Sequence, residues 1–377
     1  MKAGIYIHIP FCQIKCMYCD FYSITKREND MPRFVDMLIQ EIKQSSENYK
    51  ENWIFDTIFF GGGTPSLMQS IWIEKILNAL NTHFNLNHVK EITLEANPGE
   101  AQLDNLINFH KLGINRLSIG FQSLQPKLLS FLSRLHNPTD SLKTFENARN
   151  AGFENINIDM IFNIPGQTIK MWEHDLEQII KLNPEHISAY SLTVEPNTIL
   201  YDQILNGTIS MPSVNNNLKM FELTQKYLSN HEYKQYEISN YTKQGRECQH
   251  NLHYWNLEPY LAFGPSAHGY DGKIRSWNIS SLDSYIQKIE KDESPKSGSE
   301  KLSTIDHYNE IIFNGLRTKN GIQLKKMDPR DLHSQHFNST IKKWNGKLDV
   351  TKQVVRLKKE HYVFADEIAS DLMQDKP

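Results

Sequence analysis

The amino-acid sequence predicts an α/β fold, in which a parallel sheet rolls into a full or partial barrel and a small helical domain follows. Six short runs rich in Ile, Leu or Phe, each bounded by Gly, Pro or Asn, occupy the first two hundred of the 377 residues. Such runs are typical of buried strands. Helical patterns separate them, and strands that alternate with helices indicate parallel pairing. The predicted strands are 4–9, 56–60, 91–95, 116–121, 155–161 and 186–192.

The helices between these strands are predicted from the spacing of their apolar residues. Apolar residues recur at three- and four-residue intervals from Phe34 to Ile42 and again from Ile76 to Phe84, which is the period of an amphipathic helix. These stripes indicate core packing and no function. In a barrel of parallel strands the chemistry lies at the carboxyl ends of the strands. Each unusual motif of this sequence begins where a predicted strand stops.

Composition divides the whole chain into a barrel, a connecting segment, a linker and an accessory domain. The barrel is predicted over 1–235, including a polar helical stretch near 215–228, and a Gly- and aromatic-rich connecting segment over 236–290. The run 291–301 is low in hydrophobicity and indicates a surface linker. The predicted accessory domain, 302–377, is mainly helical with a terminal hairpin.

The overall charge excludes one class of partner. Hydrophobic residues make up 39% of the chain and charged residues 23%, with a formal net charge of −3 and a pI of about 6.6. No strongly basic field is available to hold nucleic acid. No run of eighteen apolar residues exists, and the amino terminus enters a strand at once, so we expect neither a membrane anchor nor a targeting peptide. A cytoplasmic protein is expected.

Three cysteines form the most informative motif. Cys12, Cys16 and Cys19 follow the first predicted strand with the spacing Cys-x3-Cys-x2-Cys. A [4Fe–4S] cluster normally takes four thiolates, so three leave one iron open to bind a small molecule and pass it an electron. Structural zinc would need a distant fourth ligand such as Cys248. A disulfide framework is disfavoured by only 4 cysteines in the chain. The pattern therefore favours a cluster.

Polar residues at the other strand ends suggest a ligand. The glycines of Gly61-Gly62-Gly63-Thr64 permit close approach of a ligand or positive φ, although a tight turn without a ligand fits equally. They lack the order of a nucleotide-phosphate loop. Glu95 closes the third strand, where it suits a ribose diol or is a solvated charge.

Three further polar residues extend this pattern. Gln122 ends the fourth predicted strand, Arg134 follows it, and Asp159 falls within the apolar fifth strand. A carboxylate there is unfavourable unless it is paired or faces a ligand. Arg134 is a suitable partner for Asp159 or for a ligand carboxylate. With the open cluster, these groups describe a site for a ligand with amino-acid and ribose parts.

These motifs together resemble a known family. The segment YIHIPFC at 6–12, with the three-cysteine loop, resembles the radical S-adenosylmethionine (SAM) enzymes. The narrower resemblance is to the oxygen-independent coproporphyrinogen III oxidase family and, within it, to the HemW-type branch. It covers essentially the whole chain and implies an α/β fold with a radical SAM (β/α)6 partial TIM-type barrel. The motifs that carry it are GGGTP at 61–65, NRLSIGFQS at 115–123, RLH at 134–136 and IPGQT at 164–168.

The resemblance implies roles for individual residues. Cys12, Cys16 and Cys19 would ligate the [4Fe–4S] cluster, and the amine and carboxylate of SAM would chelate the open iron. One electron would then cleave SAM to methionine and a 5′-deoxyadenosyl radical, while the protein orients the cofactor. The residues implied to line the SAM site are Tyr6, Gly62, Gly63, Thr64, Glu95, Gln122, Arg134 and Asp159.

Two branches of this family differ in function. One decarboxylates propionates of coproporphyrinogen III, and the other resembles a haem chaperone that hands haem to respiratory proteins. The oxidase branch has a further cysteine where Phe21 stands and a long extension before the cluster, whereas eleven residues precede Cys12 here. We therefore expect a haem chaperone lacking oxidase activity. The alternatives are the oxidase itself or a radical SAM enzyme with another substrate.

The segment His250-Asn251-Leu252-His253-Tyr254-Trp255 matches the HNxxYW motif of the chaperone branch. The resemblance implies that His250, Asn251, Tyr254 and Trp255 bind haem, since imidazole ligates haem iron and aromatic rings pack on a porphyrin. Alone, the same residues fit an aromatic packing corner. Cys248, His253 and His268 are further candidates for the iron ligand. The implied partners are haem and a respiratory haemoprotein acceptor, with the chain a monomer or homodimer.

Two residues depart from the family pattern. Asn163 stands where Gly is usual, and Pro265 interrupts a loop that is usually richer in Gly. Asn tolerates the left-handed region better than most residues, so the first change is expected to preserve the loop.

Overall fold

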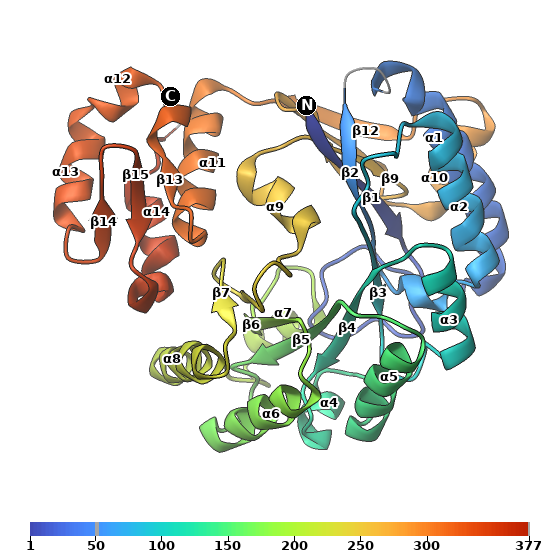
Figure 1. The fold of residues 1–377 in the computed structure, drawn as a ribbon, viewed down its shortest axis with the longest axis horizontal. Coiled ribbons are helices and arrows are strands. Elements are labelled where there is room, and N and C mark those ends of the chain that lie inside the picture. Colours follow the sequence, from blue (N-terminus) through green and yellow to red (C-terminus); the bar gives the residue numbers. More distant parts are fainter. Residues whose placement is uncertain (50–52, 376–377) are drawn as a thin grey trace.

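A twelve-stranded sheet forms the body of the protein, whose residues 1–49 and 53–375 are described in this computed structural model (Figure 1). Its strands are β1 (Lys2–Ile9), β2 (Ile54–Gly62), β3 (Glu91–Ala96), β4 (Arg116–Gln122), β5 (Ile156–Phe162), β6 (His186–Ser191), β7 (Lys234–Gln235), β8 (Asn240–Thr242), β9 (Tyr260–Phe263), β10 (His268–Tyr270), β11 (Ile274–Asn278) and β12 (Lys296–Lys301). Neighbours follow the order β12-β11-β10-β9-β1-β2-β3-β4-β5-β6-β8-β7.

The six predicted strands are confirmed as β1 to β6, each within a few residues of its predicted ends. They pair in parallel in sequence order, and β9 adds a further parallel strand beside β1. The remaining pairs are antiparallel and lie at the two edges. Because β6 pairs with β8 and not with β1, the sheet curves without closing, and the barrel is partial.

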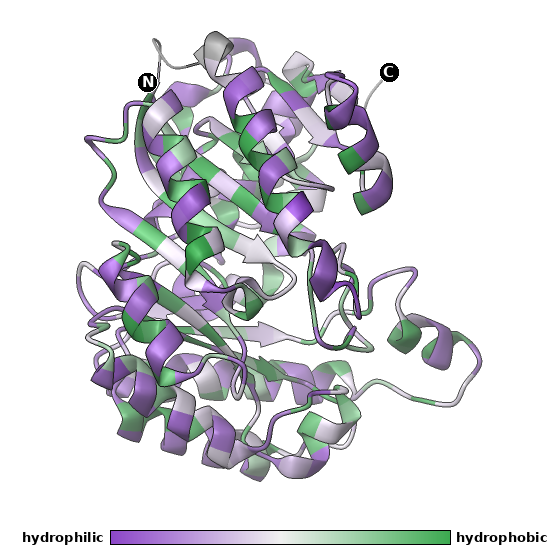
Figure 2. Ribbon diagram, turned by 90° about the vertical axis from the view of Figure 1, so that its right-hand side faces the viewer, coloured by the Kyte–Doolittle hydropathy of each residue, from purple (hydrophilic) through white to green (hydrophobic). Residues whose placement is uncertain are grey.

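Helices cover the outer face of the curved sheet (Figure 1). The α1 stripe buries Phe34, Leu38 and Ile42 completely, as its spacing predicts. Figure 2 shows the same division as green and purple residues alternating around the helices. The helices of this part are α1 (Met31–Tyr49), α2 (Ser70–His83), α3 (Leu103–Lys111), α4 (Pro126–Phe131), α5 (Pro138–Asn150), α6 (Ile169–Leu182), α7 (Ile199–Leu205), α8 (Val214–Asn230), α9 (Gln249–Asn256) and α10 (Leu282–Glu290), with short 3-10 turns at Glu28–Asp30 and Pro65–Leu67.

Two predicted boundaries differ from the structure. The segment 236–290 does not simply connect two domains, since it supplies β8 to β11 of the main sheet. The predicted linker 291–301 is on the surface, but its second half is strand β12, paired with β11. An edge strand is held by backbone hydrogen bonds on one side, so its sequence, KSGSEK, needs no apolar alternation.

The carboxyl-terminal region has a core of its own, centred on Ile312, Leu316, Val355 and Ile368. It is mainly helical, and the predicted hairpin is present as β14 and β15, although α14 follows it. No helix among the described residues is long and apolar enough to cross a membrane. The elements of the carboxyl-terminal region are α11 (Thr304–Arg317), β13 (Ile322–Gln323), α12 (Pro329–Leu332), α13 (Gln335–Lys343), β14 (Leu348–Val350), β15 (Val354–Leu357) and α14 (Ala365–Leu372), with 3-10 turns at Leu324–Lys326 and Lys359–Phe364.

Candidate cluster and ligand site

The cysteine loop begins where β1 ends and lies at the carboxyl edge of the parallel strands. Cys12, Cys16 and Cys19 all line one cavity of about 340 Å³, together with residues that follow β2, β3 and β4. The base of the loop is closed by two backbone hydrogen bonds, from Cys12 N to Ile24 O at 2.9 Å and from Ile24 N to Pro10 O at 2.7 Å. The three thiols are thus presented to a common space by a tethered loop.

The chemistry of these thiols fits an iron–sulfur cluster. All three are free and partly exposed. Burial raises the pKa of Cys12, and that of Cys19 to about 11, so these thiols hold their protons until metal charge replaces them. Among the described residues, no three His, Cys, Asp or Glu side chains converge as ligands of one ion would. In a [4Fe–4S] cluster each of the three thiolates would bind its own iron.

The zinc alternative that uses Cys248 is wrong. Its thiol is fully buried and donates to Glu91 Oε1 at 3.6 Å, away from the cavity that the other three cysteines line. Cys248 directly precedes α9 and lies beside Glu91 at the amino-terminal end of β3, whereas the cysteine loop lies at the carboxyl ends of the parallel strands.

The glycine run after β2 makes room for protein atoms as well as for a ligand. A Cβ on Gly63 would lie 2.6 Å from Phe11 O and 3.0 Å from Cys12 Sγ. Gly62 has φ of 109°, and a Cβ there would lie 2.6 Å from the His8 ring. The run therefore lets the end of β2 pack directly against the cysteine loop.

Arg134 faces the cluster cavity and not Asp159. Its Nη2 donates to Asn97 Oδ1 at 2.5 Å and to Gly120 O at 3.0 Å, and Nη1 lies 3.6 Å from Cys16 Sγ. The predicted Arg134–Asp159 pair is therefore wrong, which leaves a ligand carboxylate as the predicted partner of Arg134. Asn97 was not among the predicted residues, although an Asn directly after a strand at this edge was the available signal.

Asp159 and Glu95 lie on the wall of a second cavity, of about 310 Å³, which shares Gly62 with the first. Asp159 accepts hydrogen bonds from Ser118 Oγ at 2.9 Å and Asn157 Nδ2 at 2.7 Å. Burial, with repulsion by Asp159, raises the pKa of Glu95 to about 8, and burial also raises the pKa of Asp159. A protonated carboxyl can donate as well as accept hydrogen bonds, which suits a ligand diol.

The remaining predicted SAM residues lie at the same edge. Thr64 Oγ1 donates to Cys12 Sγ at 3.6 Å, and the Tyr6 hydroxyl lies 3.2 Å from His8 Nδ1. Gln122 ends β4 in the left-handed region, with φ of 66°, a conformation that residues other than Gly adopt mainly at constrained sites. Gln122 does not line either cavity.

Asn163, just after β5, also has a left-handed backbone. Its φ is 63°, which confirms the conformation expected where the family has Gly.

The HNxxYW motif lies on α9, which packs against β1 and β2. Glu91 at the start of β3 holds this helix by accepting hydrogen bonds from the backbone N–H groups of Gln249 and His250, each at 3.0 Å. His250, Asn251 and Tyr254 line the same cavity as Tyr6, Glu95 and Asp159, whereas the partly buried Trp255 does not. The structure therefore joins most of the motif to the predicted SAM wall.

Both ring nitrogens of His250 are engaged. Nδ1 lies 2.8 Å from Thr57 Oγ1, and Nε2 lies 2.8 Å from the Tyr254 hydroxyl. The ring stacks on Phe59 with centroids 5.2 Å apart, and burial lowers its pKa well below the ordinary value. His250 is thus a neutral imidazole inside an aromatic corner.

The other ligand candidates differ in availability. His253 lies between Asp56 and Glu258, 2.7 Å from each, and these hydrogen bonds outweigh burial and raise its pKa to about 9. It is therefore protonated and unsuited to bind iron. His268 is exposed on β10 and stacks on Trp277, and no hydrogen bond joins its ring to another described residue.

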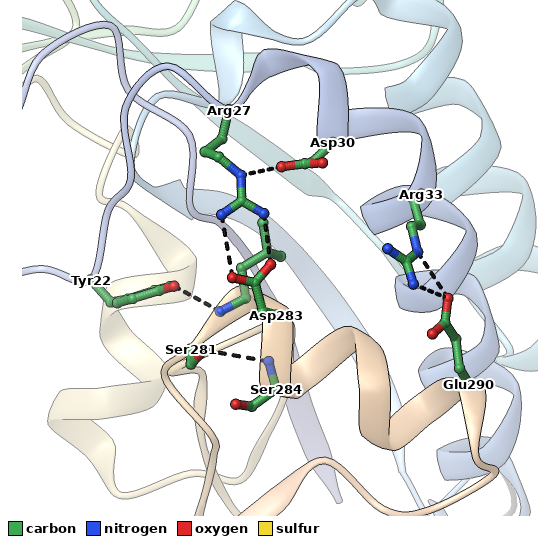
Figure 3. A network of polar contacts seen from close by, with 9 residues as sticks. Tyr22, Arg27, Asp30, Arg33, Ser281, Asp283, Ser284 and Glu290 are labelled. Carbon is green, nitrogen blue, oxygen red and sulfur yellow. Dashed lines mark hydrogen bonds and ion pairs between the residues drawn. The ribbon is translucent and has the colours of Figure 1, made fainter.

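Ion pairs anchor the end of the cysteine loop to α10 (Figure 3). Arg27 pairs with Asp30 and, at 2.6 Å, with Asp283, while Arg33 pairs with Glu290 at 2.6 Å. The Tyr22 hydroxyl accepts a hydrogen bond from the backbone N–H of Leu282. Each exposed pair contributes at most about 1 kcal/mol, so the network orients the loop more than it stabilises the fold.

Comparisons with known proteins agree with the motifs. The profile of the radical SAM superfamily matches residues 6–179. The haem chaperone HemW of Bacillus subtilis is 36% identical over 86% of this chain and 86% of its own length, and that of Escherichia coli is 37% identical over 72% of each. The structure of E. coli coproporphyrinogen III oxidase, a radical SAM enzyme, superposes with a TM-score of 0.85 over 99% of this chain and 90% of that one. At 21% identity this last likeness shows a shared fold.

Proposed function

This chain belongs to the HemW family of radical SAM proteins, and from that premise we propose that it is a haem chaperone that uses a [4Fe–4S] cluster and SAM. The observation that carries the proposal is the similarity to relatives named haem chaperones, which extends over 86% of both chains for the B. subtilis protein. Phe21 supports it, because this side chain is 63% exposed where the oxidase branch has a further cysteine.

The cluster would lie in the first cavity, and SAM would extend from it past Gly62 into the second. Cys12, Cys16 and Cys19 would hold the irons, and the guanidinium of Arg134, next to Cys16, suits the carboxylate of SAM. Glu95 and Asp159 would hold the ribose hydroxyls. When bound, the cluster supplies one electron and SAM supplies a cleavable sulfonium.

Haem would bind at the HNxxYW segment, with His250 Nε2 as the iron ligand and Asn251, Tyr254 and Trp255 around the macrocycle. The Tyr254 hydroxyl must first release Nε2, from which it lies 2.8 Å away. His250 is fully buried, so α9 must also shift for haem to enter. We further propose that the acceptor is a respiratory haemoprotein and that transfer starts from the cytoplasm.

A haem titration of the cluster-loaded protein under anaerobic conditions tests this assignment. The wild-type protein should bind one haem with a shifted Soret band, and His250→Ala should lose it. The matched control is His268→Ala, which removes an exposed imidazole and should bind as the wild type does. The reverse pattern would move the ligand to His268. Unchanged binding in both variants would remove the histidine assignment.

The oxidase is the second candidate, because the shared fold extends over nearly the whole chain. Anaerobic turnover decides between the two functions. The reconstituted protein is supplied with SAM, a reductant and coproporphyrinogen III, and protoporphyrinogen is sought by chromatography. Product at catalytic ratios would overturn the chaperone proposal, and intact cluster without product supports it. Binding of SAM without any binding of haem would instead favour another substrate.

A further inference from the structure

A buried arginine without a partner lies on the floor of the second cavity. Arg116 opens β4, is 2% exposed and lines this cavity. No hydrogen bond or ion pair joins its side chain to another described residue, and its Nε is a buried donor without a partner. A buried cation is strongly unfavourable unless a negative group reaches it. Glu91 and Asp159 act on this cation only from beyond hydrogen-bond and ion-pair distance, so the guanidinium has no anion in direct contact with it.

The residues around Arg116 add hydroxyl groups, of which that of Thr93 is unused. Thr93 pairs with Arg116 in the register of β3 and β4, and its fully buried Oγ1 has no hydrogen-bond partner in the described structure. Ser118 is the next residue of β4 to face inward, where it lines the cavity with Ser188 and Tyr190. A cation and several hydroxyl groups thus line one cavity, with the unused hydroxyl of Thr93 beside the cation in the sheet.

Three carboxylates lie around this space, but each is already engaged elsewhere and none pairs directly with Arg116. Glu91 already accepts hydrogen bonds from the amino terminus of α9 and from Cys248. Glu95 accepts one from the backbone N–H of Gly62 at 3.2 Å. Asp159 is bonded to Ser118 and Asn157, and burial raises its pKa. None of these three carboxylates comes within ion-pair distance of Arg116 in the described structure, although all three act on it electrostatically.

We propose that the floor of this cavity is a carboxylate-binding subsite in which Arg116 pairs with the ligand. Guanidinium forms two parallel hydrogen bonds with a carboxylate, which fixes both position and orientation. A cavity of about 310 Å³ takes a small carboxylate or the acid arm of a larger ligand. If the arm is a propionate of haem, the subsite rests on the proposed function; a free carboxylate does not require it.

Paired ligands distinguish these sources in the full-length, cluster-loaded protein. Affinities are measured for haem and for its dimethyl ester, in which both carboxylates are masked. If a propionate arm of haem binds at Arg116, the wild type should bind haem about tenfold more tightly than the dimethyl ester, because the ester cannot form the charge-assisted pair. Arg116→Gln should abolish the preference. The matched control Arg33→Gln, at an exposed arginine of α1, should retain it.

A second measurement does not depend on haem. The melting temperature is followed with millimolar propionate and with propionamide, its neutral analogue. A rise with propionate alone, absent in Arg116→Gln, supports the subsite even if haem never binds, which would refute only the chaperone proposal. If Arg116→Gln fails to fold, Arg116→Lys takes its place. The difference in the melting temperature of the wild type between propionate and propionamide then also tests the subsite. Equal affinity for haem and its ester, together with no propionate effect, would overturn the subsite.

Discussion

Gly63→Ala should displace the cysteine loop and lower cluster occupancy. The added Cβ would lie 2.6 Å from Phe11 O, 2.9 Å from Ile9 O and 3.0 Å from Cys12 Sγ. Two of these atoms belong to the backbone of β1 and the loop, so no side-chain rotation relieves the contact. Overpacking of this kind destabilises by about 1–3 kcal/mol. We expect Gly63→Ala to lose this much stability and to hold the Cys12 thiolate in the wrong position for the cluster.

Two assays measure the outcome. Urea unfolding of the cluster-free protein gives the change in free energy, and the visible absorbance after anaerobic reconstitution gives occupancy. Cys16→Ala sets the lower limit of occupancy, because it removes a proposed ligand. Gly346→Ala is the matched control, since nothing lies within 4 Å of its added Cβ. Full occupancy in Gly63→Ala, with stability within about 0.5 kcal/mol of wild type, would refute the packing argument.

Three further predictions concern single side chains. Tyr254→Phe frees Nε2 of His250 and should tighten haem binding about fivefold, since the lost hydrogen bond is worth about 1 kcal/mol; unchanged affinity in the titration would count against His250 as the ligand. The pKa of Glu95 is raised from 4.5 to about 8, so the folded protein keeps a proton on Glu95 that the unfolded chain has lost between these pH values. The stability of the fold therefore falls as the pH rises from 4.5 to 8. Glu95→Gln should raise the melting temperature at pH 8.5 but not at pH 4. The pKa of His253 is raised from 6.5 to about 9 in the folded protein. Protonated His253 therefore contributes its full stabilisation below pH 6.5, and this contribution is lost as the pH rises above 9. His253→Gln should therefore destabilise by about 1.5–3 kcal/mol at pH 6 and much less at pH 9.5 in urea unfolding, and an equal loss at both would contradict the charged pairs.

Much of the fold was predictable because its signals are local. Buried parallel strands are continuous apolar runs, so β1 to β6 were recognised from their own residues. The edge strand β12 was missed because its residues are exposed and polar, and only pairing with β11 makes it a strand. The strand β9 was also missed, since its four residues lie within a Gly- and aromatic-rich segment.

The candidate site was predictable only where spacing carries the information. The cysteine loop is one such case, because three thiols within eight residues must lie close together. The partner of Arg134 was predicted wrongly, since Asn97, just after β3, reaches it from a distant part of the chain. Arg116 went unnoticed because a charged residue that opens a strand usually faces water, and nothing local shows that this one faces inward.

The sequence by itself determined the family, the order of strands and helices, and the three thiols, because each depends on residues close together in the chain. Tertiary structure decided that the HNxxYW helix lies against the same cavity as Glu95 and Asp159, and that Arg116 points into that cavity without a partner. These arrangements depend on the register of parallel strands and on the place where α9 packs. Register and packing join residues more than a hundred positions apart, as Glu91 and His250 are joined, and no local pattern records such contacts.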